Sequence, residues 1–218
     1  FWLKFFFSSR PSCRTASHTI SAMFSEDPKI WAAPDGFKPD IPPMTFHESG
    51  RMKTRYELND AGHMNGLYEE FYDDESSTLK HRVTYMDGVM HGAEELHYPD
   101  GTLFQQRASV DGWYDGVEER WYKSGTLRSR FRWRRGMLVG YIQHFYESGA
   151  LKSMEFRDDD GKRDMCEHSF DEASRVTRTL VWSKGDLVLE QLYDEVGAIT
   201  SEKRCAAARG DRGNCVIC

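Results

Sequence analysis

The segment Trp121–Arg130, WYKSGTLRSR, decides the fold because it recurs along the chain. HYPDGTLFQQ from His97 and FYESGALKSM from Phe145 match it position for position. Each copy reads aromatic or His, Tyr, two polar residues, Gly, a small residue and Leu. The leucines of the three copies are 24 residues apart: Leu103, Leu127 and Leu151. Such a fixed period indicates a repeat architecture.

Weaker copies of the segment lie on both sides of these three. The upstream copies begin at Phe46 and Phe71, and the second of them carries an insertion in its turn. The downstream copy from Phe170 lacks the Tyr and the Gly, and a last poor copy surrounds Gly197. The leucine position of the weaker copies is filled by Met52, Leu79 and Val176.

A second pattern runs in phase with the first. Glycines recur in pairs that are four residues apart, namely Gly62 and Gly66, Gly88 and Gly92, Gly112 and Gly116, and Gly136 and Gly140. The first glycine continues as Gly161 and Gly185, whereas Met165 and Leu189 stand in the second position. Two patterns that stay in phase over about seven units establish a true repeat.

Each unit predicts two strands joined by tight turns. VEERWY and LRSRFRW alternate apolar and polar residues, as half-buried strands do, and PDGT and KSGT have turn composition. Successive hairpins with short loops form an antiparallel meander. We therefore expect an all-β fold, an elongated single-layer antiparallel meander of about seven stacked β-hairpin repeats over residues 44–200. About fourteen strands would extend it to roughly 65 Å.

Aromatic residues make up 13% of the chain, which a single-layer sheet would explain. Without a second layer, large side chains must cover one another across neighbouring strands. One position of the repeat holds Phe71, Trp121, Phe145 and Phe170. The next position, which alternation places on the opposite face, holds Tyr72, Tyr98, Tyr122 and Tyr146. We expect these side chains to pack, and we include Tyr98, Tyr122 and Tyr146 in a candidate binding surface.

The combined motif, an aromatic residue, Tyr, two further residues, Gly and Leu with an in-phase glycine pair, resembles the MORN repeat. It is most similar to the variant found in bacterial proteins of the YwqK type, which are often labelled antitoxins. The resemblance covers about residues 44–200 and is strongest between Gly66 and Gly140. It implies stacked hairpins in one twisted sheet without catalytic residues of its own. It further implies a scaffold, a protein-binding surface or a lipid-binding module.

Signs of catalysis or metal binding are weak. The eight histidines lack zinc-site spacing, and no serine stands in a nucleophile elbow. Glu94, Glu95, Glu118, Glu119 and Glu147 recur with the repeat, which predicts a solvated face. The net charge of −6 argues against a dedicated nucleic-acid binder. We expect no enzyme, no cofactor and no metal.

The most distinctive surface feature is RSRFRWRR, which begins at Arg128. Strand alternation places Phe131 and Trp133 on one face and four arginines on the other: Arg128, Arg130, Arg132 and Arg134. These arginines have two alternative roles. They bind anionic lipid headgroups or an acidic partner, or they pair with acids of neighbouring strands such as Glu118.

The two ends of the chain differ from the repeats. Residues 1–43 form an irregular leader, and its first part, Phe1–Ser25, is basic, serine-rich and free of acids. This composition fits a targeting peptide, or else an untranslated leader that precedes Met23. The five cysteines show no disulfide framework, which favours a reducing compartment.

Residues 201–218 are expected to form a flexible tail that ends in Cys215-Val-Ile-Cys218. This ending fits a C-a-a-X box, in which Cys215 is prenylated. One lipid chain holds a protein only weakly, so a second signal is needed. Cys205 is a candidate for palmitoylation, and Lys203, Arg204, Arg209 and Arg212 form a basic cluster. The alternatives are a redox- or metal-active C-x-x-C pair and coincidence.

Together these observations predict a non-catalytic repeat scaffold that binds a protein or an anionic lipid partner and no nucleic acid. We expect it in the cytoplasm, tethered to a membrane where the tail is prenylated. The alternative is a soluble, antitoxin-type protein that neutralises a protein partner and has no membrane role.

Overall fold

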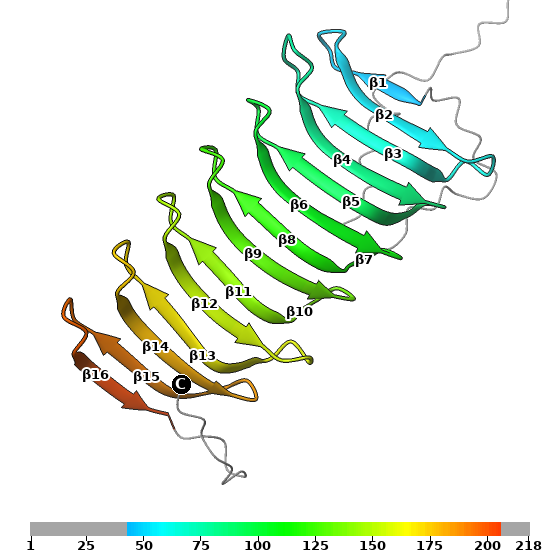
Figure 1. Cartoon of the computed structure of the whole chain (residues 1–218). Helices are drawn as coiled ribbons and strands as arrows, with labels where there is room; N and C mark the ends of the chain where they lie inside the picture. Colours follow the sequence, from blue (N-terminus) through cyan, green and yellow to red (C-terminus); the bar gives the residue numbers. More distant parts are fainter. Residues whose placement is uncertain (1–42, 206–218) are drawn as a thin grey trace, which may run out of the picture.

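The computed structural model describes residues 43–205, and this part of the chain forms one open antiparallel sheet (Figure 1). It confirms the predicted all-β meander. Each main strand pairs with the strands before and after it, while the short β7 and β10 pair with β6 and β9. The strands are β1 (Met44–Phe46), β2 (Met52–Leu58), β3 (Met64–Phe71), β4 (Leu79–Met86), β5 (Val89–His97), β6 (Leu103–Val110), β7 (Trp113–Tyr114), β8 (Gly116–Trp121), β9 (Leu127–Arg134), β10 (Met137–Leu138), β11 (Gly140–Phe145), β12 (Leu151–Arg157), β13 (Arg163–Phe170), β14 (Val176–Ser183), β15 (Asp186–Tyr193) and β16 (Ile199–Arg204).

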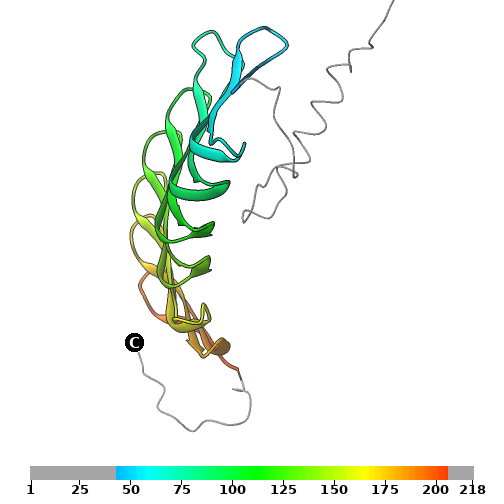
Figure 2. The ribbon, with the colours of Figure 1, turned by 90° about the vertical axis from the view of Figure 1, so that its right-hand side faces the viewer.

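The sheet is elongated and curved. Viewed from its side, successive hairpins stack along one axis and each bends across its width (Figure 2). The described residues contribute no second layer. The repeats were predicted for residues 44–200, and β16 carries the sheet on to Arg204, so Lys203 and Arg204 lie in a strand.

Tight turns at the glycine pairs reverse the chain. Asp111 and Gly112 have φ values of 50° and 78°, and the same left-handed pair recurs at Asp87–Gly88, Arg135–Gly136 and Lys184–Gly185. Two consecutive residues with positive φ match the right-handed twist of the flanking strands. The second glycine position is also left-handed, and Met165, which replaces that glycine, keeps a φ of 62°.

The two faces of the sheet are defined by cross-strand partners. Face A carries the row Tyr68, Val83, Glu94 and Arg107, in which each residue pairs with the next. Face B carries the neighbouring row Glu69, Arg82, Glu95 and Gln106, which continues through Glu119 to Arg130. Register shifts recur near the end of each hairpin and locally break the alternation of faces.

The apolar core lies on face A in the N-terminal half of the sheet. Met64, Tyr68, Val83 and Met90 are buried there, and Tyr56, Leu58, Tyr85 and Tyr114 pack against them. The ring of Tyr68 lies 6.5 Å from that of Tyr56 and 6.4 Å from that of Tyr85. Here aromatic side chains cover one another across strands, in agreement with the explanation of the aromatic content. Burial raises the pKa of Tyr85 to about 12.

Neighbouring units are also joined at the glycine-pair turns. The amide of Gly136 donates to the carbonyl of Tyr114 in the preceding unit, at 2.8 Å, and Gly112 donates likewise to Met90. The ring of Trp113 covers Gly136 so closely that a Cβ added there would lie 2.5 Å from its Cε3. Glycine is therefore required at Gly136 by packing as well as by its φ of 76°.

Candidate binding surface

The repeat tyrosines join each hairpin to the next. Their hydroxyls donate to main-chain carbonyls of the following unit: Tyr72 to His97, Tyr98 to Trp121, Tyr122 to Phe145 and Tyr146 to Phe170, at 2.8–3.0 Å. His47 stands in the tyrosine position of the first unit, and its Nε2 lies 3.0 Å from the carbonyl of Phe71. Thus Tyr98, Tyr122 and Tyr146 have a structural role, whether or not they also meet a partner.

This tyrosine ladder ends where the repeat weakens. Asp171 and Asp194 occupy the next two tyrosine positions. Each carboxylate instead accepts amides of its own turn, as Asp171 does from Ala173 and Arg175, both at 2.9 Å. The change from Tyr to Asp therefore replaces a hydrogen bond between two units with hydrogen bonds inside one turn.

The four arginines of β9 are all exposed and alternate with Ser129, Phe131 and Trp133. Arg128 lies opposite a register shift at Arg120 and Trp121, and its guanidinium packs over the ring of Tyr122 at 5.7 Å. Lys80 and Lys152 occupy the same position over Tyr72 and Tyr146. Arg128 is thus part of the tyrosine ladder, which leaves a row of three arginines on face B.

Two of those three arginines are paired with acids. Arg130 contacts Glu119 across β8 and β9 at 2.7 Å, and Arg134 contacts Asp159 at 2.8 Å. The acid expected to meet the arginines, Glu118, lies on face A and bonds elsewhere. Arg132 is exposed, and in the part of the chain that the structure describes no acid lies within ion-pair distance of it.

Arg132 is surrounded by apolar surface that the sequence analysis did not identify. Arg132 pairs across the strands with Val117, which is 53% exposed. The Cδ of Arg132 lies next to Gly140. Tyr141 follows Gly140, is also 53% exposed, and packs edge-on against Phe156 at 5.2 Å. The available signal was strand alternation, which places Val117 and Tyr141 on the face opposite to the next residue, Glu118 or Ile142, and both of those residues are buried. We call Arg130, Arg132, Arg134, Val117 and Tyr141 the arginine patch.

The prediction that the repeated glutamates form a solvated face is wrong for Glu94 and Glu118, and a glutamate that the prediction did not name, Glu69, is buried as well. Glu69, Glu94 and Glu118 are 1%, 4% and 0% exposed. Burial alone would raise the pKa of Glu94, but hydrogen bonds from His81 and Arg107 lower it to about 2. Arginines from both neighbouring strands, Arg55 and Arg82, bind Glu69. Cross-strand partners thus let a thin sheet bury its carboxylates.

Glu118 is the most completely buried of these carboxylates. It accepts hydrogen bonds from Nε of Arg120 and from Nε1 of Trp133, both at 2.7 Å. The same arrangement recurs in a later unit, where Trp182 donates to Glu167 at 3.2 Å. A buried charge needs such partners, and both are provided by the repeat.

The histidines follow the strand pattern. Burial lowers the pKa of His97 and of His144. His144 packs edge-on against Phe131 at 5.6 Å. Within residues 43–205, no group of His, Cys, Asp and Glu side chains is arranged to hold a metal ion.

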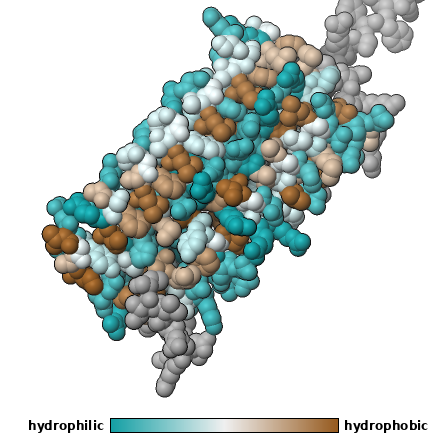
Figure 3. All heavy atoms as spheres, viewed as in Figure 1, coloured by the Kyte–Doolittle hydropathy of each residue, from teal (hydrophilic) through white to brown (hydrophobic). Residues whose placement is uncertain are grey.

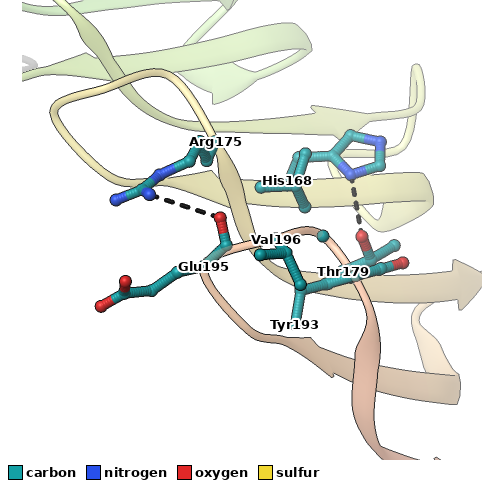
Figure 4. A pocket seen from close by; sticks show the side chains of 8 residues that line it. His168, Arg175, Thr179, Tyr193, Glu195 and Val196 are labelled. Carbon is teal, nitrogen blue, oxygen red and sulfur yellow. Dashed lines mark hydrogen bonds between the residues drawn. The ribbon is translucent and has the colours of Figure 1, made fainter.

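A shallow hollow of about 440 Å³ lies between the turns of the last two units (Figure 4). Three of its polar side chains are already bonded to neighbours, since Nδ1 of His168 meets Oγ1 of Thr179 at 3.1 Å and Arg175 donates to the carbonyl of Glu195. Val196, at the rim, is 88% exposed. The hollow shows no converging groups of the kind that catalysis requires.

Of the predicted lipidation sites, Cys215 lies outside the described residues. Cys205 is a free cysteine of intermediate exposure, and its amide donates to the carbonyl of Val188 at 2.9 Å. No helix in the described part of the chain has the length and apolarity to span a membrane. On the face shown in Figure 3, apolar side chains form separate patches along the sheet, with polar side chains between them.

Comparison with known proteins adds no identification, because no family model and no curated protein matches the chain.

Proposed function

We propose that this protein is a non-catalytic repeat scaffold of the MORN-like type that binds an anionic partner on face B, at the arginine patch. The partner is an acidic protein segment or a surface of anionic lipid headgroups. The observation that carries the proposal is Arg132, an exposed guanidinium that has no acid partner among residues 43–205 and is set between exposed Val117 and Tyr141.

The charge pattern of face B supports this location. In the N-terminal half of face B, Arg82 forms ion pairs with both Glu69 and Glu95. The charges of this part of the face therefore neutralise one another. Along β9 the balance changes, because three arginines stand at alternate positions, about 7 Å apart. Within the described part of the chain, Arg130 and Arg134 alone among the three have acid partners, and the partner of Arg134, Asp159, is itself 82% exposed. An anion that arrives here competes only with weak, solvated pairs.

The apolar neighbours favour a macromolecular or lipid partner over a free ion. Aromatic residues and arginine are enriched where proteins bind one another, and isolated surface charges contribute little affinity. Tyr141 also has a rigid support, because Phe156 holds its ring. The surface is therefore pre-organised before binding.

Membrane attachment is a separable part of the proposal. It rests on the sequence Cys215-Val-Ile-Cys218, with Lys203 and Arg204 at the end of the sheet as nearby positive charges. Expression in a eukaryotic cell, with intact mass and detergent partition as readouts, tests it. A mass gain of one isoprenoid that is lost in Cys215→Ser supports attachment, and an unmodified protein contradicts it.

The binding test uses the unlipidated full chain with two probes, phosphatidylcholine vesicles with and without phosphatidylserine, and a polyglutamate peptide. Arg132→Gln should weaken binding of the preferred probe about fivefold, since a cation near a charged surface is worth roughly 1 kcal/mol. The matched control is Arg178→Gln, which makes the same charge change at an exposed arginine paired with Glu190. Equal losses in both variants, or no binding of either probe, would contradict the proposed site.

A further inference from the structure

Cys166 of β13 is disulfide-bonded. The other cysteine of the described residues, Cys205, is free. The bond therefore joins Cys166 to one of the three cysteines that lie outside residues 43–205: Cys13, Cys215 or Cys218. The spacing of the cysteines gave no sign of this bond, because they show no disulfide framework.

Cys166 occupies a position of the repeat that is exposed in the two preceding units. The equivalent residues on face B, Val117 and Tyr141, are each 53% exposed, whereas Cys166 is 8% exposed. Its cross-strand partner Val181 stands where β9 has exposed Arg132, and it is only 9% exposed. A segment that is bonded to Cys166 and lies over face B accounts for this loss of exposure.

The C-terminal tail starts in the cross-strand row of Cys166. Cys166 pairs with Val181, Val181 pairs with Leu189, and Leu189 pairs with Arg204, the last residue of β16. Arg204 therefore lies at the same level along the strands as Cys166. The two residues are three strand spacings apart, which is about 14 Å.

We infer that Cys166 is bonded to Cys215 or Cys218 of the tail, and that residues 206–218 thereby lie over face B at β13 and β14. The length of the tail fits this span. Cys215 is eleven residues beyond Arg204. A flexible chain of that length has a root-mean-square end-to-end distance of about 18 Å, close to the distance that must be spanned.

The leader fits the span less well. Cys13 precedes Met44 of β1 by 31 residues, and a flexible chain of that length has a root-mean-square end-to-end distance of about 31 Å. β1 and β13 are ten strand spacings apart in the sheet, which is about 48 Å. The tail therefore presents its cysteines to Cys166 at a higher effective concentration than the leader does.

The bond can form by exchange with a small disulfide such as oxidised glutathione. One thiolate of the pair attacks the oxidant and releases one glutathione thiol, and the second thiolate then attacks the mixed disulfide and releases another. The two cysteines lose two electrons and two protons in total. The disulfide bond of the oxidant breaks, and one bond forms between the cysteines.

The bond would have two consequences. It ties the tail to the last units of the sheet, where Asp171 and Asp194 replace the tyrosines that join earlier units. Where Cys215 is the partner, it also prevents prenylation of Cys215, because the thiol is no longer available. This second consequence rests on the proposed membrane attachment, whereas the bond itself goes beyond the proposed function and does not depend on it.

The test uses the full, unlipidated chain, equilibrated with oxidised glutathione, alkylated, digested with trypsin and analysed by mass spectrometry without reduction. We expect the peptide of Cys166, residues 164–175, to be linked to the C-terminal peptide, residues 213–218. Cys205 is the matched control, since it lies closer in sequence to the tail cysteines but should be alkylated. Alkylated Cys166, or its linkage to Cys13 or Cys205, would overturn the inference.

A second measurement asks whether the fold brings the two cysteines together. The equilibrium constant of the bond is measured against glutathione, in buffer and in urea that unfolds the chain. We expect it to fall about fivefold in urea, because the connection grows from the eleven residues beyond Arg204 to the 49 residues between Cys166 and Cys215. Equal constants would overturn the inference.

Single variants identify the bonded cysteine of the tail. Cys215→Ser and Cys218→Ser are digested in the same way, and the variant that loses the linked peptide lacks the partner of Cys166. These measurements involve neither prenylation nor anion binding, so their failure would leave the proposed function unaffected.

Discussion

The hydroxyl of Tyr122 donates a hydrogen bond to the main-chain oxygen of Phe145, 2.8 Å away in the next hairpin. The two residues are 23 positions apart in sequence, almost one repeat. Since equivalent bonds recur from Tyr72 to Tyr146, the tyrosine that marks each repeat also couples it to its neighbour. The residue that defines the repeat in the sequence therefore also forms the hydrogen bond between successive hairpins.

Removing one hydroxyl of the ladder should lower stability measurably. Tyr122→Phe leaves the carbonyl of Phe145 without this donor, and we expect a loss of about 1 kcal/mol in the free energy of unfolding. Urea denaturation measures it. Tyr141→Phe is the control, because Tyr141 is 53% exposed, and it should change stability by less than about 0.5 kcal/mol. Equal effects of the two substitutions would argue against the ladder.

Removal of the buried carboxylate of Glu118 should lower the free energy of unfolding far more than removal of the carboxylate of neighbouring Glu119. Glu118→Ala leaves Nε1 of Trp133 and the guanidinium of Arg120 without their acceptor, and we expect a loss of about 3 kcal/mol or more. Glu119→Ala removes only an exposed pair with Arg130 and should lose at most about 1 kcal/mol. Chemical denaturation of both variants compares them. Similar losses would show that the burial of Glu118 contributes little.

Glu94 should make stability depend on acidic pH. Its pKa in the folded protein is about 2, below its ordinary value of 4.5. A depressed pKa stabilises the folded state above the unfolded value, and this contribution disappears as the pH falls from about 4.5 through 2. It amounts to about 3 kcal/mol. Unfolding free energies of the native chain and of Glu94→Gln, measured across this range, should converge at low pH. Parallel curves would contradict the assignment.

Two glycine substitutions separate backbone strain from packing. Gly125 and Gly136 have φ values of 84° and 76°, but a Cβ at Gly125 would meet nothing within 4 Å, whereas one at Gly136 would collide with Trp113. Gly125→Ala should therefore cost about 1–2 kcal/mol, the strain of a left-handed residue. Gly136→Ala should cost clearly more in thermal or chemical denaturation. The reverse order would refute the packing role of Trp113.

The hairpin architecture was predictable because its determinants are local. The turn glycines and the alternation of LRSRFRW depend on neighbouring residues, and the 24-residue period fixes how the hairpins follow one another. The burial of Glu118 was not predictable in the same way. It depends on Trp133, which is brought close only by the pairing of β8 with β9.

In the candidate surface, too, some features follow from the local sequence and others depend on strand pairing. Alternation correctly placed Arg130, Arg132 and Arg134 together, but it could not detect the register shift that moves Arg128 onto Tyr122. Nor does composition reveal that Arg130 has an acid opposite it while Arg132 faces Val117. Cross-strand partners, which decide whether a charge is free, require the register.

A pair of deletions tests the central claim most directly, that the chain is a modular scaffold and that it binds its partner through the arginine row of one unit. Removing residues 116–139 takes out one 24-residue repeat with the arginine row, and removing residues 92–115 takes out the preceding repeat and spares it. The measurement is binding of both variants to phosphatidylserine vesicles and polyglutamate, after circular dichroism confirms strand content. We predict that both variants fold as shortened sheets and that only the first loses binding. Unfolding of both, or equal binding by both, would contradict the account.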